Sequence, residues 1–425
     1  MGISSALYSG VSGLNTNSQA MTVIGNNLAN TNTLGFKGSR TVFSDLLSST
    51  INGSGGTSQV GRGVNVSKVD NIFSQGTFES TESGLDVAIE GDSFFLVSEE
   101  GTDAINYTRA GAFRFDENGF LVNPEGFRVQ GKEFDVDGAL VAGDPDDIQV
   151  GNTGLIAGNA TDAMSLTTNL DAAANVPAAG FDHTDPATFN YSSSTQVFDS
   201  LGEPHLLTTY FRKSDPNEWD WSWSAEDDTG TLFGPAATDD TIADLGGATI
   251  NFNGDGTLVA GTGGPINLGP FDWLNGSEDT QTIDITFNNT QFDSESTVIS
   301  QDQNGFGAGN LTSVDIDGEG VVIASYSNGE QMKVASLVLG KFNNPNGLRQ
   351  VGNNLYEASE TSGTPRVGLP GTELGKVFTN SLEQSNVDMG AEFVRMITVQ
   401  RGFQANSKII TTVDELLGEL INLKR

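Results

Sequence analysis

The most regular hydrophobic pattern in the chain covers its last forty residues, 386–425. Apolar side chains recur there at alternating spacings of three and four, which places them in a stripe along one side of a helix. When this alternation continues over several turns, it predicts a second helix packed against the stripe. The predicted C-terminal seam consists of Met396, Val399, Phe403, Asn406, Ile410, Val413, Leu417 and Leu420.

A second stripe of the same spacing lies within residues 3–29. Periodicity alone also fits a single surface helix that rests on a local core. The next forty residues offer little core, however, so the two terminal helices are predicted to cover each other. Ser18 and Gly25 are small enough to let a partner approach closely, and we hypothesise that Asn406 sets the register against one of them. The predicted N-terminal seam consists of Leu7, Val11, Leu14, Ser18, Met21, Gly25 and Leu28.

Between the helices the pattern changes to turns and short strands. Residues 30–38 are rich in Asn and Gly, which end helices and form defined turns. From residue 59 onward, strand-length apolar segments alternate with Gly, Asn and Asp turns about every ten residues, which is typical of all-β domains. Within residues 151–300 the predicted strands are 206–211, 219–224, 248–253 and 281–287.

The predicted fold is multidomain and mainly β, with the terminal α-helices paired as a coiled coil and two nested all-β domains. Residues 1–30 and 385–425 form a discontinuous helical domain, and residues 31–72 form an extended linker with a turn and short strands. Residues 73–150 and 301–384 form one β domain. Residues 151–300 form a second, acidic β domain that is inserted into the first.

Charge is distributed unevenly along the chain, whose formal net charge is −35. Residues 1–72 carry +2 and residues 385–425 carry 0, so residues 73–384 hold −37. An acidic surface repels nucleic acid and anionic membranes, and neither is expected as a partner. Solubility is the simplest explanation of the acidic middle. The near-neutral ends are expected to pack against copies of themselves.

Composition excludes several kinds of chemistry. The absence of cysteine rules out disulfides, thiolate metal sites and a cysteine nucleophile. His183 and His205 lack metal-ligand spacing, and no G-x-S-x-G elbow is present, so we expect no enzyme activity, cofactor or metal. The apolar runs are too short for a membrane span. The N-terminus fits neither a cleaved signal peptide nor, with Ala6 at the required Ser or Thr position, a myristoylation site.

Three local patterns allow a functional interpretation beside a structural one. Residues 305–310 are Gly-rich but lack Gly-Lys-Ser/Thr, which favours a connection between domains over a phosphate loop. Residues 135–138 and 315–319 are similar to calcium loops but lack the twelfth-position Glu, so hairpin turns are favoured and calcium binding stays open. The alternating Trp219, Trp221 and Trp223 form either a sugar-binding platform or a core face, and the core is favoured.

Short motifs occur in a fixed order that spans both ends of the chain. The N-terminal signature is carried by Leu14, residues 24–30 (IGNNLAN) and residues 32–37 (NTLGFK). The further motifs lie at residues 73–76, 85–91, 94–95, 107–113, 116–119, 126–131, 326–329 and 382–388. Together they resemble the flagellar rod and hook axial protein family, although Asn15-Thr16 departs from its usual small residue or Ala after Leu14. Residues 151–300 carry no recognisable motif, and the length favours the hook proteins over the shorter rod proteins.

The resemblance implies a structural subunit that is exported unfolded by the flagellar type III apparatus, without a cleaved signal, and polymerises outside the cell. The implied polymer is the curved, tubular flagellar hook, a universal joint that transmits torque from the rod of the basal body to the filament. Its implied partners are other copies of the chain, the rod and hook–filament junction proteins, and the hook cap and export apparatus during assembly. A distal-rod or junction protein is the near alternative, and a secreted carbohydrate-binding adhesin is the distant one.

The implied site is therefore an assembly surface. If helix pairs pack side by side in a tube, both seams are assembly surfaces, and the helices become fully ordered only when polymerisation buries them. The acidic β domains then face outward and keep finished tubes apart. The family's motif turn, which follows the N-terminal helix, consists of Asn26, Asn27, Asn30, Asn32, Gly35, Phe36 and Lys37.

Overall fold

The computed structural model describes residues 2–47, 49–53, 56–102, 104–135, 138–151, 154–178, 180–227, 231–234, 249–278 and 280–422. The chain divides into two compact units. Unit 1 comprises residues 1–152, 314–324 and 332–425, and unit 2 comprises residues 153–313 and 325–331. Unit 2 is thus an insertion within unit 1. The finer division of unit 1 into a helical domain, a linker and a β domain stays a prediction.

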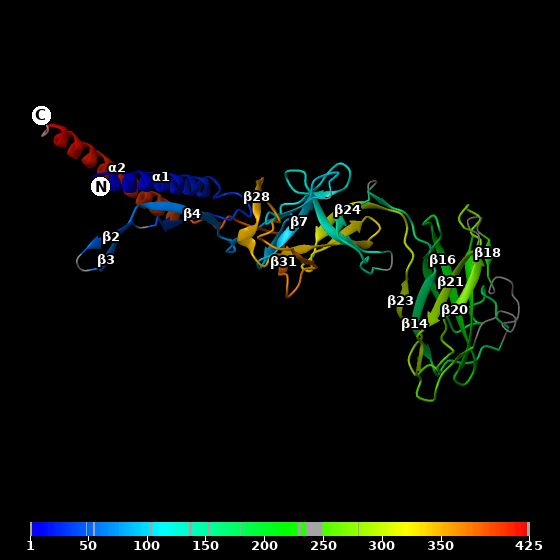
Figure 1. The fold of residues 1–425 in the computed structure, drawn as a ribbon. Helices are drawn as coiled ribbons and strands as arrows, with labels where there is room; N and C mark the ends of the chain where they lie inside the picture. The colour runs from blue at the N-terminus through cyan, green and yellow to red at the C-terminus, as the bar shows by residue number, and fades with distance from the viewer. Residues whose placement is uncertain are drawn as a thin grey trace. The chain divides into compact units, whose positions relative to one another are not determined.

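Two long helices at the ends of the chain lie side by side in unit 1 (Figure 1). They are α1 (Gly2–Ala29) and α2 (Met389–Asn422). A two-stranded antiparallel ribbon of β1 (Ser39–Asp45) and β4 (Val64–Asn71) contacts α1, with a register shift between Val42 and Phe43. The prediction that the terminal helices pair is confirmed.

The β part of unit 1 is built on a sheet with the strand order β25-β26-β11-β7-β8-β29-β28. The pairs from β26 to β28 are antiparallel. Its core includes Val87, Ile89, Phe95, Leu337 and Leu339, all fully buried. Besides β1 and β4, the strands that lie wholly or mostly in unit 1 are β2 (Ser49–Gly53), β3 (Gly56–Val60), β5 (Phe78–Ser80), β6 (Val87–Glu90), β7 (Phe94–Ser98), β8 (Ile105–Thr108), β9 (Arg114–Phe115), β10 (Leu121–Val122), β11 (Arg128–Glu133), β12 (Asp146–Asp147), β25 (Val321–Tyr326), β26 (Gln331–Leu337), β27 (Leu339–Lys341), β28 (Arg349–Gly352), β29 (Leu355–Glu357), β30 (Arg366–Gly368), β31 (Lys376–Thr379) and β32 (Ser381–Glu383), with a short 3-10 helix at Pro345–Gly347.

Unit 2 is all-β and contains two five-stranded sheets that share one core. One sheet has the order β20-β21-β14-β22 with β23 also beside β14, and the other has the order β15-β16-β17-β18 with β19 beside β17. Its strands are β13 (Leu155–Ile156), β14 (Ala163–Asp171), β15 (Tyr191–Phe198), β16 (Pro204–Asp215), β17 (Glu218–Glu226), β18 (Leu232–Phe233), β19 (Ile250–Asn251), β20 (Ile266–Phe271), β21 (Gln281–Phe287), β22 (Thr290–Phe292) and β23 (Thr297–Gln303), and β24 (Gly309–Ile316) continues into unit 1.

Alternation of buried and exposed side chains explains why these segments form strands. In β16, Leu207 and Phe211 are fully buried whereas Leu206 is 55% exposed, as expected for a strand with one face on the core. The predicted strands 206–211, 219–224 and 281–287 are therefore present as β16, β17 and β21. Of the predicted strand 248–253, residues 250–251 form β19, and Ala248 lies outside the described residues.

The three alternating tryptophans belong to the core of unit 2. Trp219, Trp221 and Trp223 are 0%, 3% and 8% exposed. They pack with Phe271 and Phe287, among others, in the cluster that both sheets share. The core interpretation is confirmed, and the three rings do not form an exposed sugar-binding platform.

The acidic and Gly-rich patterns of the sequence form turns and a connecting segment in the structure. Asp317 Oδ1 accepts hydrogen bonds from the backbone N–H groups of Glu319 and Val321, both at 2.9 Å, so residues 317–320 form the hairpin turn between β24 and β25, and residues 315–316 belong to β24. At the other acidic turn Asp135 Oδ1 accepts from Ala139 N at 2.8 Å, while Val136 and Asp137 lie outside the described residues. Residues 305–310 lead from β23, in a five-stranded sheet of unit 2, into β24, which belongs to the large sheet and continues into unit 1.

Candidate assembly surface

Small residues form the contact between α1 and α2. A Cβ atom added at Gly13 would lie 2.6 Å from the side-chain amide carbon of Asn406, and one added at Gly10 would lie 3.1 Å from Ile410. On α2, a Cβ at Gly402 would lie 3.1 Å from Oδ1 of Asn17. Because these three glycines carry no side chain, the two helix backbones approach each other closely.

The predicted N-terminal seam is misplaced by one residue. The contact positions 10, 13 and 17 each precede a predicted position (11, 14 and 18), a rotation of about 100° round the helix. Val11 is 50% exposed, and Ser18 and Gly25 are exposed too. The hypothesis that Asn406 sets the register against Ser18 or Gly25 is wrong, since Asn406 lies against Gly13. The leucines dominate the hydrophobic pattern, but the absence of side chains at glycine decides where the backbones meet.

The predicted C-terminal seam agrees better with the pattern of side-chain burial in the described part of α2. Its residues Met396, Val399, Asn406 and Ile410 are half-buried, and Val413 is 6% exposed. Phe403 and Leu417 are 41% and 39% exposed. Leu420 lies in α2, but its side chain is outside the described part. On α1 the seam residues Leu7, Leu14, Met21 and Leu28 are half-buried.

A large group of apolar side chains on the two helices and beside β1 remains exposed. Leu47 is 91% exposed, Tyr8 71% and Val394 66%. A soluble monomer rarely exposes this much apolar surface in one region, so such surfaces mark interaction sites. The group, called here the exposed apolar set, consists of Tyr8, Val11, Phe43, Leu46, Leu47, Met389, Phe393, Val394, Ile397, Phe403, Ile409, Leu416 and Leu417.

Amide side chains fix the turn that follows α1. Asn27 Nδ2 donates to the Ser39 carbonyl at 2.7 Å, and Asn27 Oδ1 accepts from Ser39 N–H at 2.9 Å, so one side chain pairs both backbone groups where β1 begins. Asn30 Nδ2 donates to the Asn26 carbonyl at 2.9 Å, and Asn30 Oδ1 accepts from the Thr33 hydroxyl at 3.0 Å. Asn32, by contrast, is exposed.

The second half of this turn packs against the β part of unit 1. Gly35 has a φ of +65°, and a Cβ there would lie 2.6 Å from the carbonyl carbon of Arg109, so only glycine fits. Its N–H donates to the Glu383 carbonyl at 2.7 Å. The Phe36 carbonyl accepts from Asn386 N–H at 3.3 Å. The predicted motif turn thus joins residues 27–39 to residues 383–386; together with residues 72–76 and Arg109, we call this region the joint.

A buried carboxylate lies at the centre of the joint. Glu383 Oε1 accepts from Lys37 Nζ at 2.6 Å and from Gly76 N–H at 2.8 Å, and Glu383 Oε2 lies 3.5 Å from Arg109 Nη1. The side chains of all three charged residues are at most 1% exposed. Burial lowers the pKa values of Lys37 and Arg109, and the negative charge of Glu383 opposes that shift. One carboxylate therefore connects segments that are 274 and 346 residues apart in the sequence.

Two more side chains complete the joint. Asn386 Nδ2 donates to the Ile72 carbonyl at 2.6 Å, and Asn386 Oδ1 accepts from Gly38 N–H at 2.8 Å. The Phe73 ring lies 5.7 Å from those of Phe94 and Tyr356. These contacts attach the segments that lead into and out of the helix pair to the β part of unit 1.

Tyr356 makes this attachment sensitive to alkaline pH. Burial raises the pKa of Tyr356 from 10.0 to about 12, so its neutral form stabilises the fold fully below pH 10, and this stability is lost as the pH rises towards 12. Two pKa units correspond to about 3 kcal/mol. We expect Tyr356→Phe to reduce the loss of stability between pH 9 and 12, measured by urea unfolding at 222 nm. An unchanged pH profile would contradict this assignment.

Sequence reasoning identified the turn residues as site residues but missed their buried partners. Arg109, Glu383 and Asn386 lie within the family motifs, yet nothing in the hydrophobic pattern assigns them a role in the joint. The sequence gives no signal for Glu383, because β32 (Ser381–Glu383) has one apolar residue and its burial arises only in the fold. Within the described part of the chain, no helix is long and apolar enough to cross a membrane.

Four family profiles match successive stretches of the chain. The profile described as "Flagella basal body rod protein" matches residues 7–37, and "Flagellar hook protein FlgE/F/G D1 domain" matches residues 88–161. "Flagellar basal body protein FlaE D2 domain" matches residues 169–306, and "Flagellar basal body rod FlgEFG protein C-terminal" matches residues 379–423. The first and last stretches contain most of the helix pair and the motif turn.

Full-length relatives give the same result. The flagellar hook protein FlgE of Salmonella typhimurium is 35% identical over 97% of this chain and 98% of its own length. The FlgE proteins of Borreliella burgdorferi and Escherichia coli are each 34% identical, covering 99% of this chain and 99% and 100% of their own lengths. A crystal structure of Helicobacter pylori FlgE2 has a similar fold, with a TM-score of 0.51 at 15% identity over 73% of this chain and 99% of that one.

The paired terminal helices, the β units and these matches define an axial structural protein of the bacterial flagellum. Within this class, the chain belongs to the flagellar hook protein family. The resemblance inferred from its motifs is confirmed, and the family is one of structural proteins and not of enzymes.

Proposed function

We propose that this chain is the structural subunit that polymerises into the flagellar hook, the curved tube that transmits torque from rod to filament. The observation that carries the proposal is the end-to-end match to hook proteins at about one-third identity. The exposed apolar set on the helix pair supports it physically, because only contact with another molecule removes that surface from water.

The proposed polymer is an open helix and not a closed ring. A head-to-tail contact between two different surfaces of identical subunits repeats without limit when its rotation does not close. The terminal regions, with charges of +2 and 0, bring little mutual repulsion to such contacts. The predicted seam residues together with the rest of the exposed apolar set are the proposed assembly surface.

The finer parts of the proposal concern location and partners. As a hook subunit, the chain reaches the hook through the flagellar export apparatus without a cleaved signal. The hook cap assists assembly, and the finished tube contacts the rod and the hook–filament junction proteins. These assignments rest on family membership. A distal-rod or junction protein stays the near alternative, whereas burial of the tryptophans removes the observation that favoured an adhesin.

Electron microscopy of the purified chain tests the proposal. Under conditions that promote polymerisation, such as a high concentration of a salting-out salt, we expect long curved tubes from this chain alone. Short straight rods, or growth only on the end of another flagellar polymer, would favour the rod or junction alternative. A chain that stays monomeric at every concentration would contradict the proposed function.

A further inference from the structure

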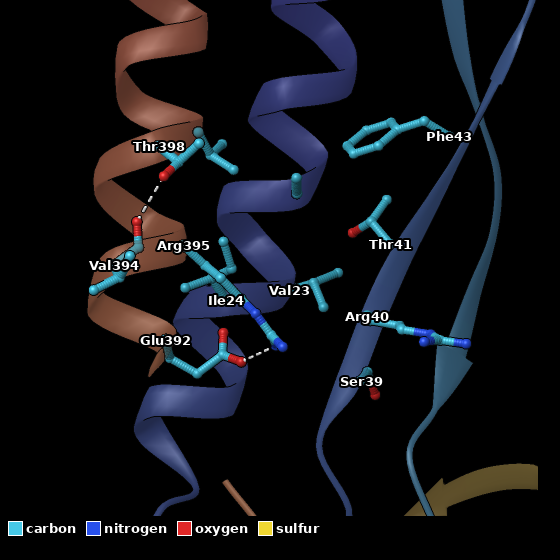
Figure 2. A pocket seen from close by; sticks show the side chains of 12 residues that line it. Val23, Ile24, Ser39, Arg40, Thr41, Phe43, Glu392, Val394, Arg395 and Thr398 are labelled. Atoms are coloured by element: carbon cyan, nitrogen blue, oxygen red, sulfur yellow. Dashed lines mark hydrogen bonds and ion pairs between the residues drawn. The ribbon is translucent and has the colours of Figure 1, made fainter. Parts of the chain in front are cut away.

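A groove lies between α1, α2 and β1 in unit 1, with a volume of about 390 Å³ (Figure 2). Its walls are mostly apolar and include Val23 and Ile24 of α1, Phe43 of β1 and Val399 of α2. Figure 2 shows Val23 directed towards β1, which carries Thr41 and Phe43. No side chain of the described residues fills this space.

One charged residue in the groove has an incomplete set of partners. Glu392 is 4% exposed, and its Oε1 lies 2.5 Å from Arg395 Nη1. Its Oε2 atom is buried without a hydrogen-bond partner among the described residues. A buried carboxylate oxygen without a donor is unfavourable, because it has lost its hydrogen bonds to water and nothing replaces them. The side chain of Arg395 is 55% exposed and can move aside, so a donor that enters the groove can reach the carboxylate.

The surrounding charges restrict the kind of donor. Arg395 and Arg40 line the groove with Glu392, which gives the lining one more positive than negative charge. The nearest carboxylate to Arg40 is Asp70 at 3.9 Å, and Asp70 also pairs with Lys68 at 2.9 Å. An incoming lysine or arginine would meet these cations. A neutral donor on an apolar side chain fits better.

Tyr8 is the residue of the exposed apolar set that combines these properties. Its aromatic ring is 71% exposed on α1, and its hydroxyl group is a neutral donor. The other members of the set are aliphatic, Met or Phe and have no side-chain O–H or N–H. We propose that Tyr8 of a second copy inserts into this groove and donates a hydrogen bond to Glu392. This inference rests on the proposed function and names one contact of the polymer.

The positions of the two partners are compatible with an open polymer. Tyr8 and the groove are different surfaces of one chain, so the contact repeats head-to-tail along an assembly when its rotation does not close. Tyr8 lies 12 to 16 residues before Ala20 and Ile24, which is about 18–24 Å along α1 at 1.5 Å per residue. Neighbouring copies that are joined by this contact with parallel helix axes are displaced along the axis by about that distance.

Cross-linking between two single-cysteine variants tests the contact directly, because the chain has no native cysteine. Tyr8→Cys and Thr41→Cys chains of different mass are mixed under polymerising conditions and treated with a short bismaleimide. We expect a mixed dimer, and none when Val367→Cys, an exposed position outside the groove, replaces Thr41→Cys. Polymers without the mixed dimer overturn the inference and leave the proposed function standing. If the wild-type chain forms no polymer, both are overturned.

A double-mutant cycle tests the hydrogen bond. Tyr8→Phe keeps the ring and removes the donor, and we expect it to raise the critical concentration for polymerisation roughly tenfold. In a Glu392→Met background, which removes both acceptor oxygens at similar size, the same change is expected to alter it by less than about twofold. Equal effects in both backgrounds would overturn the proposed partner. Helical circular dichroism of the monomers, unchanged in all variants, shows that the effect arises in assembly.

Discussion

Glu383→Gln is expected to lower the free energy of unfolding of unit 1 by about 3–5 kcal/mol, because it removes the one carboxylate between two buried cations. Lys37 need not remain as a buried, unpaired charge: burial already lowers its pKa, so it can lose its proton and become neutral. Arg109 stays charged, and it keeps the Gly91 carbonyl, 2.7 Å from its Nη2, the Phe94 ring, 5.0 Å from its guanidinium carbon, and the weaker attraction of Asp92. Most of the lost stability therefore arises at Arg109.

The two units can be followed separately in this experiment. All four tryptophans lie in unit 2, whereas α1 and α2 lie in unit 1. Urea unfolding recorded at 222 nm should show the weakened unit 1, and tryptophan fluorescence should show an unchanged unit 2. Glu373→Gln is the matched control, since Glu373 pairs with Arg366 at 2.8 Å but both side chains are more than half exposed. Exposed pairs contribute about 0–1 kcal/mol. Equal effects of the two substitutions would contradict a central role for Glu383.

Leu417→Asp is expected to abolish assembly while leaving the monomer folded. Leu417 is 39% exposed in the single chain, so the new carboxylate can stay in water there. In a polymer that covers this face, the charge is buried, and a penalty of about 3 kcal/mol raises the critical concentration more than about a hundredfold. Leu14→Asp should also prevent assembly, but Leu14 is half-buried in the monomer and its replacement also threatens the helix pair.

Thr411→Asp provides the control for added charge. Thr411 is exposed on the same helix, six residues before Leu417, which places it about 120° away round the axis. Sedimentation and electron microscopy measure polymer formation, and circular dichroism measures the monomer fold. Tubes of Leu417→Asp at wild-type critical concentration would show that this face is not an assembly surface. Loss of assembly in both variants would show that negative charge anywhere on α2 is enough.

The helix pair shows what hydrophobic periodicity can predict and what it cannot. The 3-4 spacing located both helices and predicted their pairing, since burial of apolar side chains favours a helical stripe. It placed the contact on α1 one residue too far along, because the contact depends on Gly10 and Gly13, which add nothing to an apolar pattern. The pattern on α2 was more accurate, because there the bulkier Val399, Ile410 and Val413 lie on the less exposed face.

In the joint, by contrast, a sequence motif identified the turn, but periodicity predicted none of its buried contacts. Its turn residues were recognisable from the family motif, and the position of Gly35 required an unusual backbone. The partners of Lys37 were not predictable, since Arg109 and Glu383 lie far away in the sequence and carry no periodic signal. Only the folded chain brings the three charges together, and burial then makes each of them depend on the others.

By itself, the sequence determined the helical ends, the β-rich middle, the tryptophan core of unit 2 and membership of the flagellar axial proteins, because each depends on local spacing or on ordered motifs. Tertiary structure alone decided the rotation of α1 on α2, the ionic centre of the joint and the groove around Glu392. These features depend on which distant side chains meet and which are missing. Close packing and burial are properties of the assembled fold, and no single segment contains them.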